Sequence, residues 1–138
     1  MADTVAFELV TPARLVLSQA VEMVVVPGGE GDFGVLPGHA PLISTVRPGV
    51  VDIHNGGKIT QRIFIAGGFA EVGEDRCTVL AEEAMAVEDI DRNKAEARVE
   101  AARAALEKAQ EGIDRTEAGH ELSAAEAMLA AAEGGPRH

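Results

Sequence analysis

Apolar residues in the first part of the chain occur in the short runs that are typical of β-strands. Val5, Phe7 and Leu9 would share one face of a strand, and residues 21–26 are rich in valine. Four further runs are separated by turn residues, at residues 50–53, 59–66, 70–72 and 77–81. The sequence His54-Asn-Gly-Gly57 between the first two of these predicts a hairpin turn, because its glycines permit positive φ angles. Short strands at this spacing predict a β-sandwich or barrel.

From about residue 87 onward the pattern is that of helices. Apolar residues recur at alternating spacings of three and four in two series, Val99, Ala102, Leu106, Ala109 and Ile113, and then Ala118, Leu122, Ala125, Leu129 and Ala132. Such spacing places each series on one narrow face of a helix. We therefore predict two helices that pack along a coiled-coil-like seam as an antiparallel hairpin.

The predicted helix starts carry acidic residues. Asp114-Arg-Thr-Glu117 has the spacing of a capping box and predicts the start of the second helix. Asp89 and Asp91 are expected to place negative charge on the first turn of the first helix, where it favours the helix dipole.

The composition also changes between the two halves. Eleven of the 15 glycines and five of the six prolines precede residue 84, and alanine dominates afterwards. The fold class predicted is α+β, with an N-terminal β-sandwich domain over residues 1–86, a C-terminal antiparallel α-helical hairpin over residues 87–133, and a tail over residues 134–138.

The predicted hairpin has little apolar surface of its own. A buried leucine or isoleucine contributes about 1.5–3 kcal/mol and an alanine far less, so two short alanine-rich helices would be marginal alone. The hairpin is thus a candidate for a detachable element, whose docked and undocked forms differ by a few kcal/mol. A static packing or dimerising hairpin fits the same pattern equally well.

The charge narrows the range of functions. The chain has 23 Asp and Glu against 12 Lys and Arg and contains neither Trp nor Tyr. This balance argues against binding nucleic acid or an anionic membrane surface. Cys77 is the lone cysteine, which excludes an internal disulfide and fits a reducing compartment. We read no signal peptide, and no apolar run approaches the ~18 residues that span a bilayer, so direct membrane insertion is not expected.

No candidate catalytic residue, metal site or cofactor site emerges from the motifs. The four histidines have no neighbours at metal-ligand spacing, and no P-loop or nucleophile elbow occurs. Gly29-Glu-Gly31-Asp-Phe-Gly34 has the spacing of a dinucleotide-binding turn, but its two carboxylates would repel a pyrophosphate. Pro37, Gly38 and Pro41 also prevent a helix from following it. We expect an acidic, rigid and exposed loop here.

The same segment carries a resemblance to a known family. Residues 31–42, Gly-Asp-Phe-Gly-Val-Leu-Pro-Gly-His-Ala-Pro-Leu, followed by Arg47-Pro-Gly49, resemble the epsilon subunit of F-type ATP synthases, whose mitochondrial counterpart is called delta. Phe7-Glu-Leu-Val-Thr-Pro12, residues 67–72 and residues 78–84 before the helices extend the resemblance over essentially the whole chain.

The resemblance implies a non-catalytic rotor subunit in the central stalk of a proton-translocating enzyme. Its partners would be the gamma subunit and the c ring, and possibly the alpha and beta catalytic subunits. Asp32 and His39 fall where family members touch the c ring. The implied location is peripheral, at the cytoplasmic face of the inner membrane, and no cofactor is implied.

Some family members bind ATP through a motif that starts the first helix. Ile90, Asp91, Lys94 and Ala95 match this motif, except that lysine replaces arginine and so lacks the planar fork that grips phosphate. Residues 116–133 contain four glutamates and no lysine or arginine, whereas inhibitory members present basic residues to an acidic segment of the beta subunit. Our hypothesis is that this hairpin binds ATP weakly or not at all and is a poor inhibitor of ATP hydrolysis.

Two other classes of function remain open from the residues themselves. The chain would act as a free-standing nucleotide-sensing module if the hairpin closed on a ligand. It would act as a structural adaptor if its helices formed an intermolecular coiled coil, although the seam is short and rich in alanine for that purpose.

Overall fold

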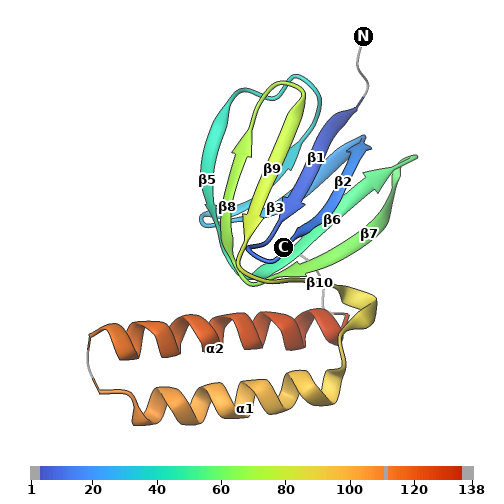
Figure 1. Ribbon diagram of the computed structural model, residues 1–138. Coiled ribbons are helices and arrows are strands. Elements are labelled where there is room, and N and C mark those ends of the chain that lie inside the picture. The colour runs from blue at the N-terminus through green and yellow to red at the C-terminus, as the bar shows by residue number, and fades with distance from the viewer. Residues whose placement is uncertain (1–3, 111, 135–138) are drawn as a thin grey trace.

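The computed structural model describes residues 4–110 and 112–134. In these residues a β-sandwich is followed by two antiparallel helices that lie across one end of it (Figure 1). The strands of the described residues are β1 (Val5–Val10), β2 (Leu15–Val21), β3 (Met23–Gly28), β4 (Gly31–Val35), β5 (Leu42–Val46), β6 (Gly49–Asn55), β7 (Lys58–Ile65), β8 (Gly68–Val72), β9 (Arg76–Ala81) and β10 (Ala84–Ala86). The predicted order of sandwich and hairpin is confirmed.

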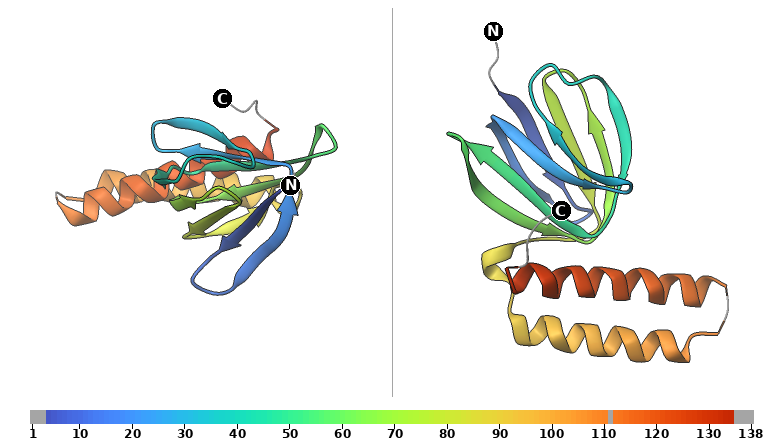
Figure 2. Two further views of the ribbon diagram at one scale, coloured as in Figure 1. Left: turned by 90° about the horizontal axis from the view of Figure 1, so that it is seen from above. Right: turned by 180° about the vertical axis from the view of Figure 1, so that it is seen from behind.

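The strands are hydrogen-bonded in the order β10-β7-β6-β3-β5-β8-β9-β1-β2, with β4 paired to β3 outside this path. Only one residue pair, Gly28 with Val46, joins β3 to β5, so the sheet folds over at that point into two layers. Figure 2 shows the layers from above and from behind. The layers enclose one apolar core whose fully buried side chains include Phe7, Leu9, Ile53 and Val79.

Local sequence explains some of these strands directly. The hairpin between β6 and β7 turns at Gly56 and Gly57, whose φ angles are +63° and +75°. Both residues adopt the left-handed conformation that glycine adopts without strain, and the predicted turn is confirmed.

The expectation of an exposed loop after β3 is wrong. Gly31–Val35 forms β4, which pairs with β3 in an antiparallel hairpin from Gly28 opposite Gly31 to Val24 opposite Val35. Phe33 packs against the core and Val35 is fully buried in it. The burial of Phe33 and Val35, at alternate positions, therefore stabilises a strand here although the neighbouring residues are glycine and aspartate.

The helices are α1 (Arg92–Lys108) and α2 (Ile113–Ala132), preceded by a 3-10 turn, η1 (Val87–Asp89). The capping-box prediction for α2 is wrong, because Gly112 occupies the cap position and Asp114 lies within the first turn. Asp91 precedes α1 instead of lying in its first turn, and its side chain accepts a hydrogen bond of 3.1 Å from the Lys94 backbone N–H. Ile113 belongs to α2 and is 73% exposed, so it is no part of the seam predicted for α1.

The rest of the seam is largely as predicted. Val99 and Ala102 of α1 pack against Ala125 of α2, with Leu122 and Leu129 beside them. A second buried stripe on α2, which the periodicity did not reveal, consists of Ala124, Met128 and Ala131. Met128 and Ala95 pack against Phe64 of β7. The hairpin is therefore docked on the sandwich, through α2 and the start of α1.

No helix among the described residues is both long and apolar enough to cross a membrane.

Candidate partner-binding site

Asp32 lies in β4, opposite Pro27, and not on an exposed turn. Its Oδ1 atom accepts a hydrogen bond of 2.5 Å from Nη2 of Arg47, and Nη1 of the same guanidinium donates to the Gly28 carbonyl at 2.6 Å. The side chain of Asp32 is only 19% exposed. The carboxylate of Asp32 is thus held by Arg47, which directly follows β5. The main role of Asp32 in this structure is therefore to fix the β3–β4 strand pair to β5.

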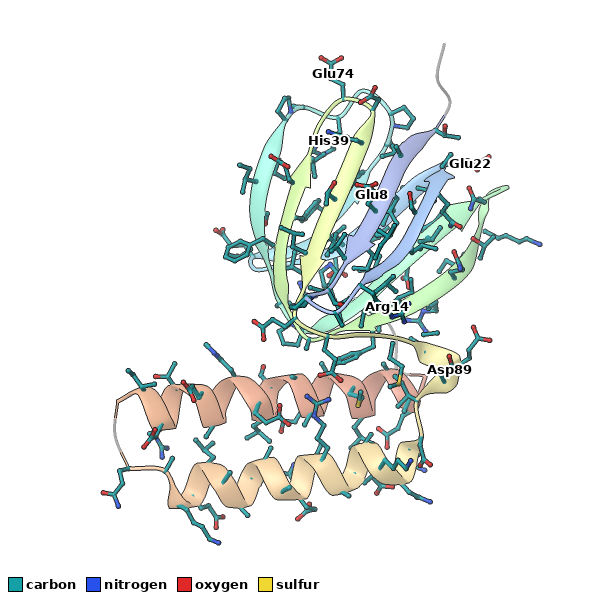
Figure 3. The ribbon with its side chains drawn as sticks, viewed as in Figure 1. Glu8, Arg14, Glu22, His39, Glu74 and Asp89 are labelled. Atoms are coloured by element: carbon teal, nitrogen blue, oxygen red, sulfur yellow. The ribbon has the colours of Figure 1, made fainter. Side chains whose placement is uncertain are left out.

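His39 lies in the turn between β4 and β5, at the end of the sandwich that points away from the helices (Figure 3). Its Nδ1 donates to the Ala40 carbonyl oxygen at 2.7 Å, which leaves Nε2 for an outside partner. The Gly38 backbone N–H donates to the Glu74 carbonyl at 2.6 Å and ties this turn to the turn between β8 and β9. Leu36 and Ile43 beside it are both more than half exposed.

The structure does not bring Asp32 and His39 together. Arg47, the partner of Asp32, directly follows β5, whereas His39 precedes the start of β5. A five-residue strand spans about 15 Å, so the two residues belong to opposite ends of β5.

Three of the four residues of the nucleotide motif have structural roles. Ile90 and Ala95 pack in the apolar cluster around Phe64, and Asp91 caps α1. Lys94 is exposed. None of the four lines the cleft between the hairpin and the sandwich.

The sequence reasoning missed an apolar surface on the outer face of the layer β5-β8-β9-β1-β2. The register places Phe69 beside Leu80, Leu80 beside Val10, and Val10 beside Leu15. We call these four residues the apolar row; Thr45 of β5 lies next to Phe69 at its end. Phe69, Leu80 and Leu15 are 57%, 54% and 54% exposed. The signal was present in the sequence Phe69-Ala-Glu-Val72, because alternation with the buried Ala70 and Val72 turns Phe69 outward.

A cleft of about 660 Å³ separates α2 from the end of the sandwich. Arg98 of α1 reaches it and donates hydrogen bonds to Glu83, which follows β9, and to Glu121 of α2, at 2.8–3.0 Å. These bonds raise the pKa of Arg98 further above its ordinary value, and the bond from Arg98 lowers the pKa of Glu121. The guanidinium is therefore committed to two carboxylates and is not available to an anionic ligand.

The described residues include no group of three or more His, Cys, Asp or Glu side chains placed to hold a metal ion. Cys77 is buried, which raises the pKa of its thiol to about 12 and keeps it protonated. The candidate site therefore consists of three surface features, which are the turn around His39, the apolar row and the cleft beside α2.

Comparisons with known proteins agree with this description. Residues 4–87 match the family described as ATP synthase, Delta/Epsilon chain, beta-sandwich domain. The chain is 60% identical over 110 residues to the ATP synthase epsilon chain of Paramagnetospirillum magneticum, covering 80% of this chain and 83% of that one. It is also 60% identical over 109 residues to that of Rhodospirillum rubrum, covering 79% and 81%.

Among solved structures, it is similar to a chain of the Euglena gracilis mitochondrial ATP synthase, from a structure of OSCP, F1 and the c-ring. The TM-score is 0.78 and the identity 27%, over 95% of this chain and 82% of that one. A chain from the central stalk and c-ring of the Tetrahymena thermophila mitochondrial enzyme shares the fold, with a TM-score of 0.64 and 12% identity, over 93% and 96% of the two chains.

Proposed function

This chain belongs to the family of ATP synthase delta/epsilon chains and is a non-catalytic subunit, and from that premise we propose that it is a rotor subunit in the central stalk. The sandwich binds the gamma subunit and stands on the c ring, so that rotation driven by proton flow is coupled to ATP synthesis. Its location is the cytoplasmic face of the inner membrane, where the rest of the complex holds it peripherally.

The apolar row is the observation that supports gamma binding most directly. It crosses four neighbouring strands of one layer, and Thr45 extends it to a fifth, over about 19 Å at the usual strand spacing. Burial of each large apolar side chain contributes about 1.5–3 kcal/mol, so covering Phe69, Leu80 and Leu15 supplies a substantial part of a stable interface. The docked hairpin lies across one end of the sandwich, where α2 contacts β6 and β7, and so leaves the apolar row uncovered. The row is thus left to another subunit.

We propose that the c ring meets the end of the sandwich that carries His39. The exposed Leu36 and Ile43 and the carboxylate of Glu74 surround this turn and give it both apolar and polar contacts. Asp32 does not belong to this surface, because it lies near the opposite end of β5 and its carboxylate is held by Arg47. The proposed contact with the c ring therefore rests on the turn around His39.

The hairpin is proposed to regulate ATP hydrolysis weakly. Its nucleotide motif is used for capping and packing, and its one arginine in the cleft is held by glutamates. In the docked form it has no basic face on α2 to offer an acidic segment of a catalytic subunit.

Co-purification with a tagged gamma subunit from the same enzyme tests the proposed function. The wild-type chain is expected to stay with gamma, and a variant with charge in the apolar row, Leu80→Glu, is expected to be lost. A wild-type chain that does not associate with gamma would overturn the proposal.

A further inference from the structure

The cleft beside α2 exists because the hairpin overhangs the sandwich. The buried residues of α2, which begin at Ala124, all lie in its second half. The first half of α2 projects past the sandwich (Figures 1 and 2). The cleft opens between this overhang and the strand ends around Thr45, Pro48 and Gly67.

The lining of the cleft is strongly acidic. Glu82 and Glu83 enter from the sandwich and Glu117 and Glu121 from α2, against a single cation, Arg98. Arg98 binds both Glu83 and Glu121, so this group of three side chains keeps one net negative charge. Glu82 and Glu117 add to it, because both are exposed and without an ion pair among the described residues. A cleft with low-dielectric walls concentrates such a field.

Much of the remaining lining is apolar, from Val46, Pro48, Ala66, Phe69 and Ala124. Thr45, His120 and Ser123 line the same space. Carboxylates above an apolar wall suit a lysine or arginine side chain, whose aliphatic stem packs on carbon while its head pairs with oxygen. Phosphates and other anions do not suit it, since they would meet uncompensated carboxylates.

The cleft is continuous with the apolar row. Phe69 belongs to both, and Glu82 follows Leu80 by two residues, which places both on the same side of the chain as it leaves β9. A protein that covers the apolar row therefore reaches Glu82 and the mouth of the cleft without a gap.

We infer that the cleft receives a lysine- or arginine-bearing segment of the subunit that covers the apolar row. This inference rests on the proposed function, in which that subunit is gamma. The apolar row supplies buried area for the contact, and Glu82 and Glu117 supply its charge complementarity and register.

The test compares two double variants of the full chain in binding to the purified gamma subunit. In Glu82→Gln with Glu117→Gln, the cleft loses its unpaired charge while its shape is kept. The matched control, Glu30→Gln with Glu107→Gln, removes two exposed carboxylates from the β3–β4 turn and α1 and changes the net charge equally. The cleft variant is expected to bind gamma about tenfold more weakly at low salt. The difference should shrink at about 0.5 M salt, where exposed charges are screened.

Equal affinities of the two double variants would overturn the inference, because the carboxylates would then act only through net charge or not at all. An unchanged affinity of the cleft variant at low salt would do the same. In both cases tight binding by the wild-type chain leaves the proposed function standing. A wild-type chain that does not bind gamma at all overturns both.

Discussion

Arg98 binds Glu83 through two parallel hydrogen bonds, from Nη1 to Oε2 and from Nη2 to Oε1, each 2.9 Å long. Glu83 belongs to the sandwich and Arg98 to α1, so this pair joins the two parts of the molecule. The same guanidinium binds both carboxylate oxygens of Glu121 on α2 and so also joins the two helices. One side chain therefore links the sandwich and both helices of the hairpin.

Replacing this arginine should loosen the docking of the hairpin. Arg98→Gln removes a doubly paired, part-buried guanidinium, and we expect docking to weaken by about 1–2 kcal/mol. Amide hydrogen exchange in α2 should accelerate about tenfold, with exchange in β1 and β9 unchanged. Arg103→Gln is the control, because Arg103 makes ion pairs only between exposed groups of the hairpin itself. Equal effects of the two variants would show that Arg98 does not hold the hairpin to the sandwich.

Docking should also depend on pH through Glu121. The bond from Arg98 lowers the pKa of Glu121 below its ordinary value of 4.5. The stabilisation is therefore fully present above pH 4.5 and is lost as the pH falls through the lowered pKa of the docked form. Amide exchange rates should be corrected for the intrinsic effect of pH on exchange. The corrected rates in α2 should then rise relative to those in the sandwich as the pH is lowered below about 4.5. In Glu121→Gln this extra acceleration should largely disappear. Persistence of the full pH effect in that variant would assign it to other carboxylates.

The protein should bind nucleotide poorly. Asp91 and Ala95 already serve α1 as its cap and its buried contact with Phe64, and the cleft beside α2 is acidic. Titration of the isolated chain with MgATP in a calorimeter should give no saturation below about 1 mM, which means a dissociation constant weaker than about 1 mM. Lys94→Arg restores the family residue and serves as the comparison. A micromolar dissociation constant for the wild-type chain would contradict the proposal.

The hairpin should be a weak inhibitor of the assembled enzyme. Removing residues 88–138 is expected to change ATP hydrolysis by the reconstituted complex by less than about twofold, under 0.5 kcal/mol in the barrier. The reason is that α2 carries no lysine or arginine after Arg115 among its residues. A chain with Arg98→Gln, in which the hairpin is present but more weakly docked, separates the effect of removing the hairpin from the effect of loosening it. A many-fold rise in hydrolysis on truncation would contradict this account.

The sequence predicted the parts of the fold that local physics decides. The Gly56-Gly57 turn, the alternation in β1 and the spacing of Val99 and Ala102 on one face of α1 each depend on residues close together in the chain. The strand β4 was missed because its glycines and Asp32 resemble a loop, while Phe33 and Val35 decide the outcome only by burial in the core. The buried stripe of Ala124, Met128 and Ala131 could not be distinguished in the sequence, because alanine occupies six of the ten positions in residues 123–132.

The candidate site was harder to predict, because its geometry depends on distant partners. Glu83 and Arg98 are 15 residues apart, and Arg98 and Glu121 are 23 apart, and no periodic pattern connects them. The apolar row depends on the register of four strands from both ends of the sandwich sequence. Asp52 is 1% exposed and paired with Arg62 at 3.0 Å, yet it lies in a run that predicts only an apolar strand.

The central claim is that the apolar row is the surface by which this subunit binds gamma. Its most direct test is the dissociation constant of the full chain for purified gamma, measured for the wild type and for Leu80→Glu, with Glu71→Gln on the same face as a control. We expect Leu80→Glu to weaken binding at least about 100-fold, since it places a charge in an apolar contact, and Glu71→Gln to change it little. Equal affinities of the wild type and Leu80→Glu would contradict the account.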